Sequence, residues 1–137
     1  MADPYFRPDE VEALIPRLAE TMERIMKAHA ASAEVRDRLK HEQHRIAMSG
    51  GGLLDQQAWR ADTDRLEKLK REIQEGLGRI AEMGGVTKDL TLGLVDFRHL
   101  RDGREVNLCW KYGEREIRFW HGLDEGYASR KPLEGGQ

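Results

Sequence analysis

The sequence has little of several features that define common protein classes. It holds a single cysteine in 137 residues, which excludes an intramolecular disulfide and agrees with a reducing compartment. No stretch approaches the roughly 20 consecutive apolar residues that span a bilayer, and the first ten residues lack the basic and apolar regions of a secretory signal. We therefore expect a cytoplasmic protein that does not enter a membrane.

An excess of one charge sign is also absent. The chain carries 23 Lys and Arg against 25 Asp and Glu, and both signs are interspersed along its whole length. A nucleic-acid-binding surface needs a local excess of basic residues, so nucleic acid is not an expected partner. The 35% of charged residues favours long solvated helices. The length corresponds to one domain over residues 1–137.

Apolar residues recur every seven positions in two stretches, which is the spacing of amphipathic helices with a coiled-coil seam. The series are Val11, Leu18, Ile25, Ser32, Leu39 and Ile46 in the first stretch, and Trp59, Leu66, Ile73 and Ile80 in the second. The run Ser-Gly-Gly-Gly at 49–52 separates them, because consecutive glycines disfavour helix. We predict a long antiparallel helical hairpin over residues 8–84.

Two helices of this length cannot bury all their apolar surface against each other, so the seam is a candidate for homo-oligomer formation. Pro16 lies inside the first helix and should kink it or mark a short separate segment. His41 and His44 share a helix face, but two histidines without further ligands do not make a metal site. We interpret them as surface residues.

After Gly85 the pattern changes to alternation, and two apolar stretches flank a glycine. Residues 104–111 and 115–121 predict a β-hairpin around Gly113-Glu114, with residues 94–97 as a third strand. The expected fold is α+β, with the helical hairpin followed by a small three-stranded antiparallel sheet in a β subdomain over 86–133. Residues 134–137 are expected to form a disordered tail.

A two-residue turn at Gly113-Glu114 would pair Asn107 with Trp120 and Cys109 with Arg118. This register gathers apolar residues on one face and polar residues on the other. It places Cys109 and His121 on opposite faces, so these two residues are not expected to act as a pair. A zinc site would also need three or four ligands in a recognisable spacing, and there is no second cysteine, so no metal and no cofactor are expected. The candidate ligand-binding residues on the polar face and the following segment are Asp96, Glu105, Asn107, Arg118, Trp120, His121, Asp124 and Arg130.

The chain resembles the bacterial family catalogued as domain of unknown function 2203. The residues that carry the resemblance are Tyr5-Phe6, Glu10-Val11, Ala13-Leu14-Ile15-Pro16, Leu18, Val95-Asp96-Phe97, Leu100, Asp102-Gly103-Arg104-Glu105-Val106, Leu108-Cys109-Trp110, Gly113-Glu114, Ile117, Phe119-Trp120-His121, Leu123-Asp124, Gly126-Tyr127-Ala128, Arg130 and Pro132-Leu133. The resemblance implies no reaction, substrate or catalytic residue. Arg7 departs from the family, which more usually has a small hydroxyl residue there that caps the first helix.

Two functions of different class follow from the residues. The favoured one is a non-enzymatic homo-oligomeric interaction or scaffold module, supported by mixed charge and heptad spacing. The alternative is a small-molecule or metal-binding domain with its site on the polar sheet face, and hydrolysis is the candidate activity. The same polar residues also suit ordinary cross-strand ion pairs on a solvated sheet. Whether the protein is an enzyme is left open.

Overall fold

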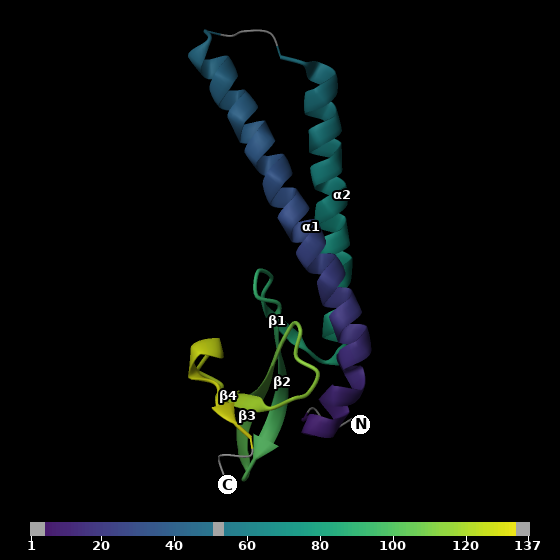
Figure 1. The fold of residues 1–137 in the computed structure, drawn as a ribbon, viewed down its shortest axis with the longest axis vertical. Helices are drawn as coiled ribbons and strands as arrows, with labels where there is room; N and C mark the ends of the chain where they lie inside the picture. Colours follow the sequence, from purple (N-terminus) through teal and green to yellow (C-terminus); the bar gives the residue numbers. More distant parts are fainter. Residues whose placement is uncertain (1–4, 51–53, 134–137) are drawn as a thin grey trace.

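The computed structural model describes residues 5–50 and 54–133. Two helices are followed by an antiparallel sheet of five strands in the order β1-β2-β3-β4-β5, and the sheet lies beside one end of the helix pair (Figure 1). The α+β class is confirmed. The expected tail at 134–137 lies outside the described residues.

Helix α1 spans Pro8–Met48 and is 41 residues long, which corresponds to about 60 Å. Pro8 takes the first helical position, where its missing N–H is not needed. The Arg7 backbone N–H donates to Glu10 Oε1 at 2.8 Å, so a helix start without a hydroxyl residue is still stabilised. The helix continues without interruption through Pro16, and the separate N-terminal segment considered from the sequence is not present.

Helix α2 spans Gln56–Met83 and runs back beside α1 (Figure 1). It begins where the Asp55 side chain accepts a hydrogen bond from the Ala58 backbone N–H at 3.1 Å, and it ends at Gly84 with φ 99°. Gly76 allows close approach of the helices, since a Cβ there would lie 2.5 Å from Ile25 Cγ1. With increasing distance from the sheet, the two helices diverge (Figure 1).

The sheet has five strands and not the three that were predicted. Strands β2 and β3 are joined by a tight turn in which Asp102 and Gly103 both have positive φ, 52° and 78°. The two strands that were not predicted are short and lie at the two edges of the sheet. Strands this short show too little alternation of apolar and polar residues to be recognised in the sequence. The strands are β1 Val86–Asp89, β2 Leu94–Arg101, β3 Arg104–Lys111, β4 Phe119–Gly122 and β5 Lys131–Pro132.

The predicted register between the third and fourth strands was wrong by one residue. Asn107 pairs with His121 and Leu108 pairs with Trp120. The reason is that residues 112–118 form a longer loop in place of a two-residue turn. Its hydrogen bonds fix the loop: Trp110 Nε1 donates to the Glu114 carbonyl at 3.0 Å, and the Ile117 N–H donates to Glu12 Oε2 at 2.9 Å. A shift of one residue turns every side chain of β4 to the other face.

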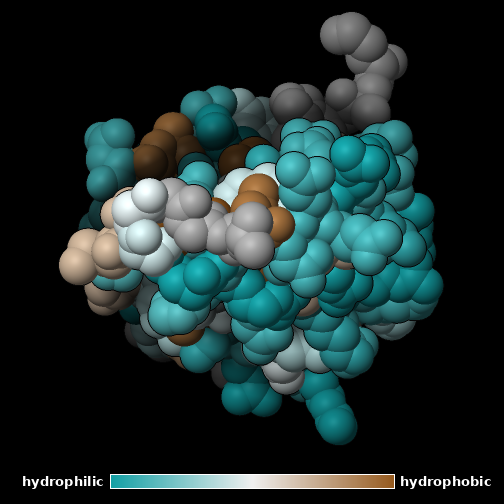
Figure 2. Space-filling view, turned by 90° about the horizontal axis from the view of Figure 1, so that it is seen from above, coloured by the Kyte–Doolittle hydropathy of each residue, from teal (hydrophilic) through white to brown (hydrophobic). Residues whose placement is uncertain are grey.

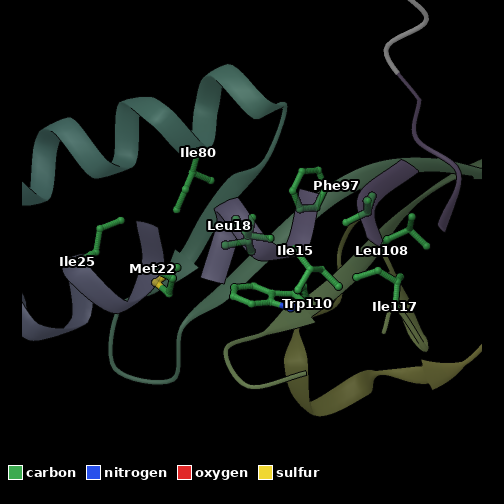
Figure 3. Packing of buried hydrophobic residues seen from close by; sticks show 11 residues of the cluster. Ile15, Leu18, Met22, Ile25, Ile80, Phe97, Leu108, Trp110 and Ile117 are labelled. Atoms are coloured by element: carbon green, nitrogen blue, oxygen red, sulfur yellow. The ribbon is translucent and has the colours of Figure 1, made fainter. Parts of the chain in front are cut away.

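The apolar sheet face packs on the first half of α1 and the last turns of α2, as Figure 3 shows. Phe97, Leu108 and Trp110 from the sheet are fully buried against Leu18 and Met22 of α1. The expectation that this face needs cover is met within the chain by the helices. The opposite face of β2 and β3 is therefore the one turned away from this core.

Candidate functional site

Three side chains of different chemistry are buried together on that second face of the sheet. Asp96 on β2, Cys109 on β3 and His121 on β4 are exposed by only 3%, 1% and 2%. Asp96 is the strand partner of Cys109. His121 is the strand partner of Asn107, which lies two residues before Cys109 on β3. One ligand atom from each of the three lies within 4.8 Å of the other two. We call these residues the buried triad.

The local sequence places the triad through strand alternation. Val95 and Phe97 point into the core, so Asp96 between them points to the other face, and Cys109 does the same between Leu108 and Trp110. His121 joins them only in the observed register. The prediction that Cys109 and His121 lie on opposite faces is therefore wrong, and the predicted pairing of Cys109 with Arg118 is wrong for the same reason.

Both ring nitrogens of His121 have polar partners. Nδ1 lies 2.9 Å from the Gly122 carbonyl oxygen, and Nε2 lies 3.1 Å from Asp96 Oδ1. A carbonyl oxygen only accepts hydrogen bonds, so Nδ1 carries a proton and donates it. One further proton is then needed between Nε2 and the Asp96 carboxylate. The imidazole has no nitrogen left to accept a proton from the Cys109 thiol.

The Cys109 thiol is held in its protonated form. Burial and, to a smaller extent, the neighbouring Asp96 carboxylate raise its pKa to about 12, while Arg130 acts in the opposite direction. A nucleophilic cysteine needs a lowered pKa and a free base beside it. The triad provides neither, so the arrangement does not suit thiol catalysis of the Cys–His–Asp type.

The segment after β4 brings Arg130 close to Cys109. The guanidinium of Arg130 stacks over the rings of Phe119 and Tyr127, at 4.1 and 4.5 Å from their centroids. Its Nη1 donates to both carboxylate oxygens of Glu114, at 3.1 and 3.0 Å. Tyr127 belongs to the short 3-10 helix η1, Tyr127–Ser129, and accepts a hydrogen bond from Lys111 at 3.4 Å. These contacts fix Arg130 near Cys109 and leave its charge balanced by Glu114.

Comparison with known protein families matches residues 4–133 to the family described as "Uncharacterized conserved protein (DUF2203)". The chain belongs to this family. The resemblance noted in the sequence is thereby confirmed, and the family description states no activity. No curated protein and no solved structure matches the chain.

Four of the predicted candidate residues lie at or beside the triad. Asp96 and His121 belong to it, and Arg130 lies over Cys109. Asn107 is 7% exposed and is the strand partner of His121. Two residues that the sequence analysis did not propose as ligands complete the surroundings, namely Cys109 and Glu114. The sequence shows that Cys109 alternates with Leu108 and Trp110 and that Glu114 follows Gly113. Whether these residues lie beside His121 depends on the register of β4, which was predicted wrongly.

The other four candidates are not brought to the triad. Trp120 pairs with Leu108 and so lies on the helix-facing side, where Arg101 and Lys131 flank its ring at 5.0 and 4.7 Å. Arg118 forms an ion pair with Glu116 at 2.6 Å in the loop before β4. Asp124 is exposed in the turn after β4. The expectation that Trp120 joins the polar face was wrong, because it depended on the mistaken register.

Glu105 lines a separate hollow at the edge of the triad. This hollow has a volume of about 280 Å³ and reaches Asp96, with Lys88, Arg98 and Asn107 among its walls. Glu105 lies between Arg98, at 3.5 Å, and Tyr5, whose hydroxyl donates to it. Asp96 is thus the member of the triad that is nearest to solvent.

None of the helices in the described ranges is long and apolar enough to cross a membrane.

Proposed function

We propose that this protein is a metal-binding domain whose centre is formed by Asp96, Cys109 and His121. The observation that carries the proposal is that a carboxylate, a thiol and an imidazole, all nearly inaccessible, converge within 4.8 Å. Burying such groups is unfavourable unless they are paired or coordinate an ion. A mixed sulfur, nitrogen and oxygen set suits a divalent transition metal, with Zn²⁺ the first candidate. This reverses the sequence-based expectation of no metal site.

The hydrogen bonds of His121 support this role. Metal-binding histidines usually donate their second ring N–H to a carbonyl or carboxylate, which fixes the ring and its tautomer. The bond from Nδ1 to the Gly122 carbonyl is of this kind and leaves Nε2 as the ligand atom. On binding, the ion would replace the proton between Nε2 and Asp96 and the proton on the Cys109 thiol. Thiolate and carboxylate then neutralise the two charges of the metal.

Three protein ligands leave a fourth tetrahedral position, as in catalytic zinc sites. When water occupies that position, the ion lowers the pKa of the water and supplies a nucleophile. A hydrolytic activity would use this water, and the hollow that reaches Asp96 would be the approach for a substrate. Asn107 and Arg130 flank the triad, and in the same proposal they bind the ligand that reaches the metal.

The test is metal analysis of the full chain purified without a metal-affinity tag, followed by replacement with Co²⁺. We expect one metal per chain and a cobalt–thiolate charge-transfer absorption, which Cys109→Ser removes. His44→Ala is the matched control, because His44 is exposed on α1 away from the triad. Wild-type protein that retains no metal and develops no charge-transfer band with added Co²⁺ would refute the proposal.

A second candidate function is the self-associating scaffold favoured by the sequence. The observation that supports it is the divergence of α1 and α2 (Figure 1), which leaves Leu39 and Trp59 only half buried in a hollow of about 540 Å³. Light scattering of the metal-free and metal-loaded protein tests it. A particle of one chain's mass at all concentrations would exclude a homo-oligomer and leave the metal proposal untouched.

A further inference from the structure

The helix pair carries two hollows of opposite charge. The first lies nearer the sheet, has a volume of about 630 Å³ and is lined by five cationic and two acidic side chains. These are Arg24, Lys27, Arg65, Lys68 and Arg79, with Glu72 and Glu75. The second lies nearer the tip, has a volume of about 540 Å³ and reverses the balance. Its charged or titratable residues are Asp37, Glu42, Asp55 and Asp62, with Arg38 and His41. We call them the basic groove and the acidic groove.

The two grooves lie on the same side of α1. Lys27, Ala28 and Ala31 line the basic groove, and Arg38, Leu39 and Glu42 line the acidic groove. Each residue of the second set follows its counterpart by eleven positions. Eleven residues make about three turns of α-helix and advance about 16 Å along the axis, so the sets occupy one helix face. One flat partner could therefore cover both grooves together.

Each groove has an apolar floor, and some of its charges have no ion-pair partner in the part of the chain that the structure describes. Leu39 and Trp59 are half buried in the acidic groove, while Ala28 and Leu69 form the base of the basic groove. Among the described residues, Lys68, Arg79 and Asp37 form no ion pair. Other groove charges are paired on the helices: Arg24 with Glu20, Lys27 with Glu23, Asp62 with Arg38, and Glu42 with Arg45. The view from the tip in Figure 2 is mainly hydrophilic, with hydrophobic atoms beside the grey segment. Charged residues outnumber apolar ones in the lining of both grooves.

We infer that a second copy of this chain packs antiparallel across this face, so that each acidic groove lies on the basic groove of the partner. The net charges are opposite, at +3 for five cations against two acids and −3 for four acids against one arginine with His41 neutral. A two-fold axis between the grooves satisfies both contacts at once, as an isologous dimer requires. A parallel arrangement would place like charges together, which is unfavourable. The inference rests on the scaffold proposal and is independent of the metal site.

Charge reversal of each groove tests the arrangement. We expect Arg65→Glu/Lys68→Glu and Asp37→Lys/Glu42→Lys each to weaken the dimer about tenfold or more at low salt, because each variant repels itself at both contacts. Mixing the two variants should restore a dimer. The reversed basic groove of one then meets the reversed acidic groove of the other, and the second contact is native. Lys40→Glu/Lys70→Glu is the control, since both lysines are exposed and line neither groove.

Sedimentation equilibrium at low and high salt, with circular dichroism to verify folding, gives the readout. Restoration of the mixed dimer, together with a wild-type dimer that weakens with salt, supports the inference. A wild-type dimer that ignores both reversals, or a mixture that stays dissociated, overturns the antiparallel arrangement alone. A monomeric wild-type protein overturns the scaffold proposal as well.

Discussion

Metal binding at the buried triad should depend steeply on pH, because the site holds protons that an ion must displace. The Cys109 thiol has its pKa raised to about 12, so it keeps its proton throughout the neutral range. The 3.1 Å contact between His121 Nε2 and Asp96 Oδ1 would need one more proton to be a hydrogen bond. Releasing the thiol proton alone makes the apparent affinity rise about tenfold per pH unit, and releasing both makes it rise about a hundredfold.

The free energy that opposes metal binding can be calculated from the cost of deprotonating the Cys109 thiol. Deprotonating a group five pH units below its pKa costs about 7 kcal/mol at pH 7, against about 3 kcal/mol for a cysteine with a pKa of 9.0. Structural zinc sites bind with roughly 10–16 kcal/mol of apparent free energy. Metal coordination can therefore overcome the burial of this thiol, but weakly bound ions cannot.

The assay is a Co²⁺ titration with a competing chelator between about pH 6.5 and 8.5, followed through the thiolate charge-transfer band. We expect a slope near two in the logarithm of affinity against pH for the wild type. Asp96→Asn should reduce the slope to about one, because the amide removes the need for a shared proton, and should weaken binding overall. An affinity that does not change with pH would refute thiolate coordination.

Three further predictions concern stability and access. Since the Cys109 thiol pKa is raised from 9.0 to about 12, the wild type should lose stability relative to Cys109→Ala as the pH rises above 9, by up to about 4 kcal/mol near pH 12, measured by denaturant unfolding. Gly76→Ala should destabilise the protein because its Cβ would meet Ile25 at 2.5 Å, whereas Gly78→Ala, which faces open space, should stabilise α2 by up to about 1 kcal/mol; equal thermal shifts would contradict the close helix contact. Arg130→Ala should speed reaction of Cys109 with a thiol reagent several-fold, while Arg118→Ala should not; unchanged rates would show that Arg130 does not control access.

The helices were predictable because their signal is repeated many times. Seven-residue spacing from Val11 to Ile46 and from Trp59 to Ile80 predicted two helices within residues 8–84, and the structure has them at Pro8–Met48 and Gln56–Met83. Glycines marked the ends, and an interior Pro16 did not break the first helix. The same redundancy explains why the apolar face of β2 and β3 was predicted well, since Val95, Phe97, Leu108 and Trp110 alternate without exception.

The fourth strand was not predictable in the same way, because it is only four residues long and its register depends on the loop before it. Gly113-Glu114 has the form of a hairpin turn, but the Ile117 N–H bonds to Glu12, more than 100 residues away in sequence, and takes the loop out of the sheet. No local pattern records that contact. Short edge strands such as β1 and β5 are likewise fixed by their neighbours rather than by their own alternation.

The difference of one residue in β4 decides what the polar face of the sheet can do. In the predicted register Trp120 and Arg118 would lie beside Cys109, and the face would be an ordinary solvated surface with ion pairs worth a few tenths of a kcal/mol each. In the observed register His121 lies there instead and contacts Asp96, and Arg130 from the following segment lies near Cys109. Because these three polar side chains are buried together, a bound ion or a shared proton is needed to offset the free-energy cost of their burial. The convergence of Asp96, Cys109 and His121 therefore depends on the register of β4, and the loop before β4 is held by a hydrogen bond to Glu12, about 105 residues away in sequence.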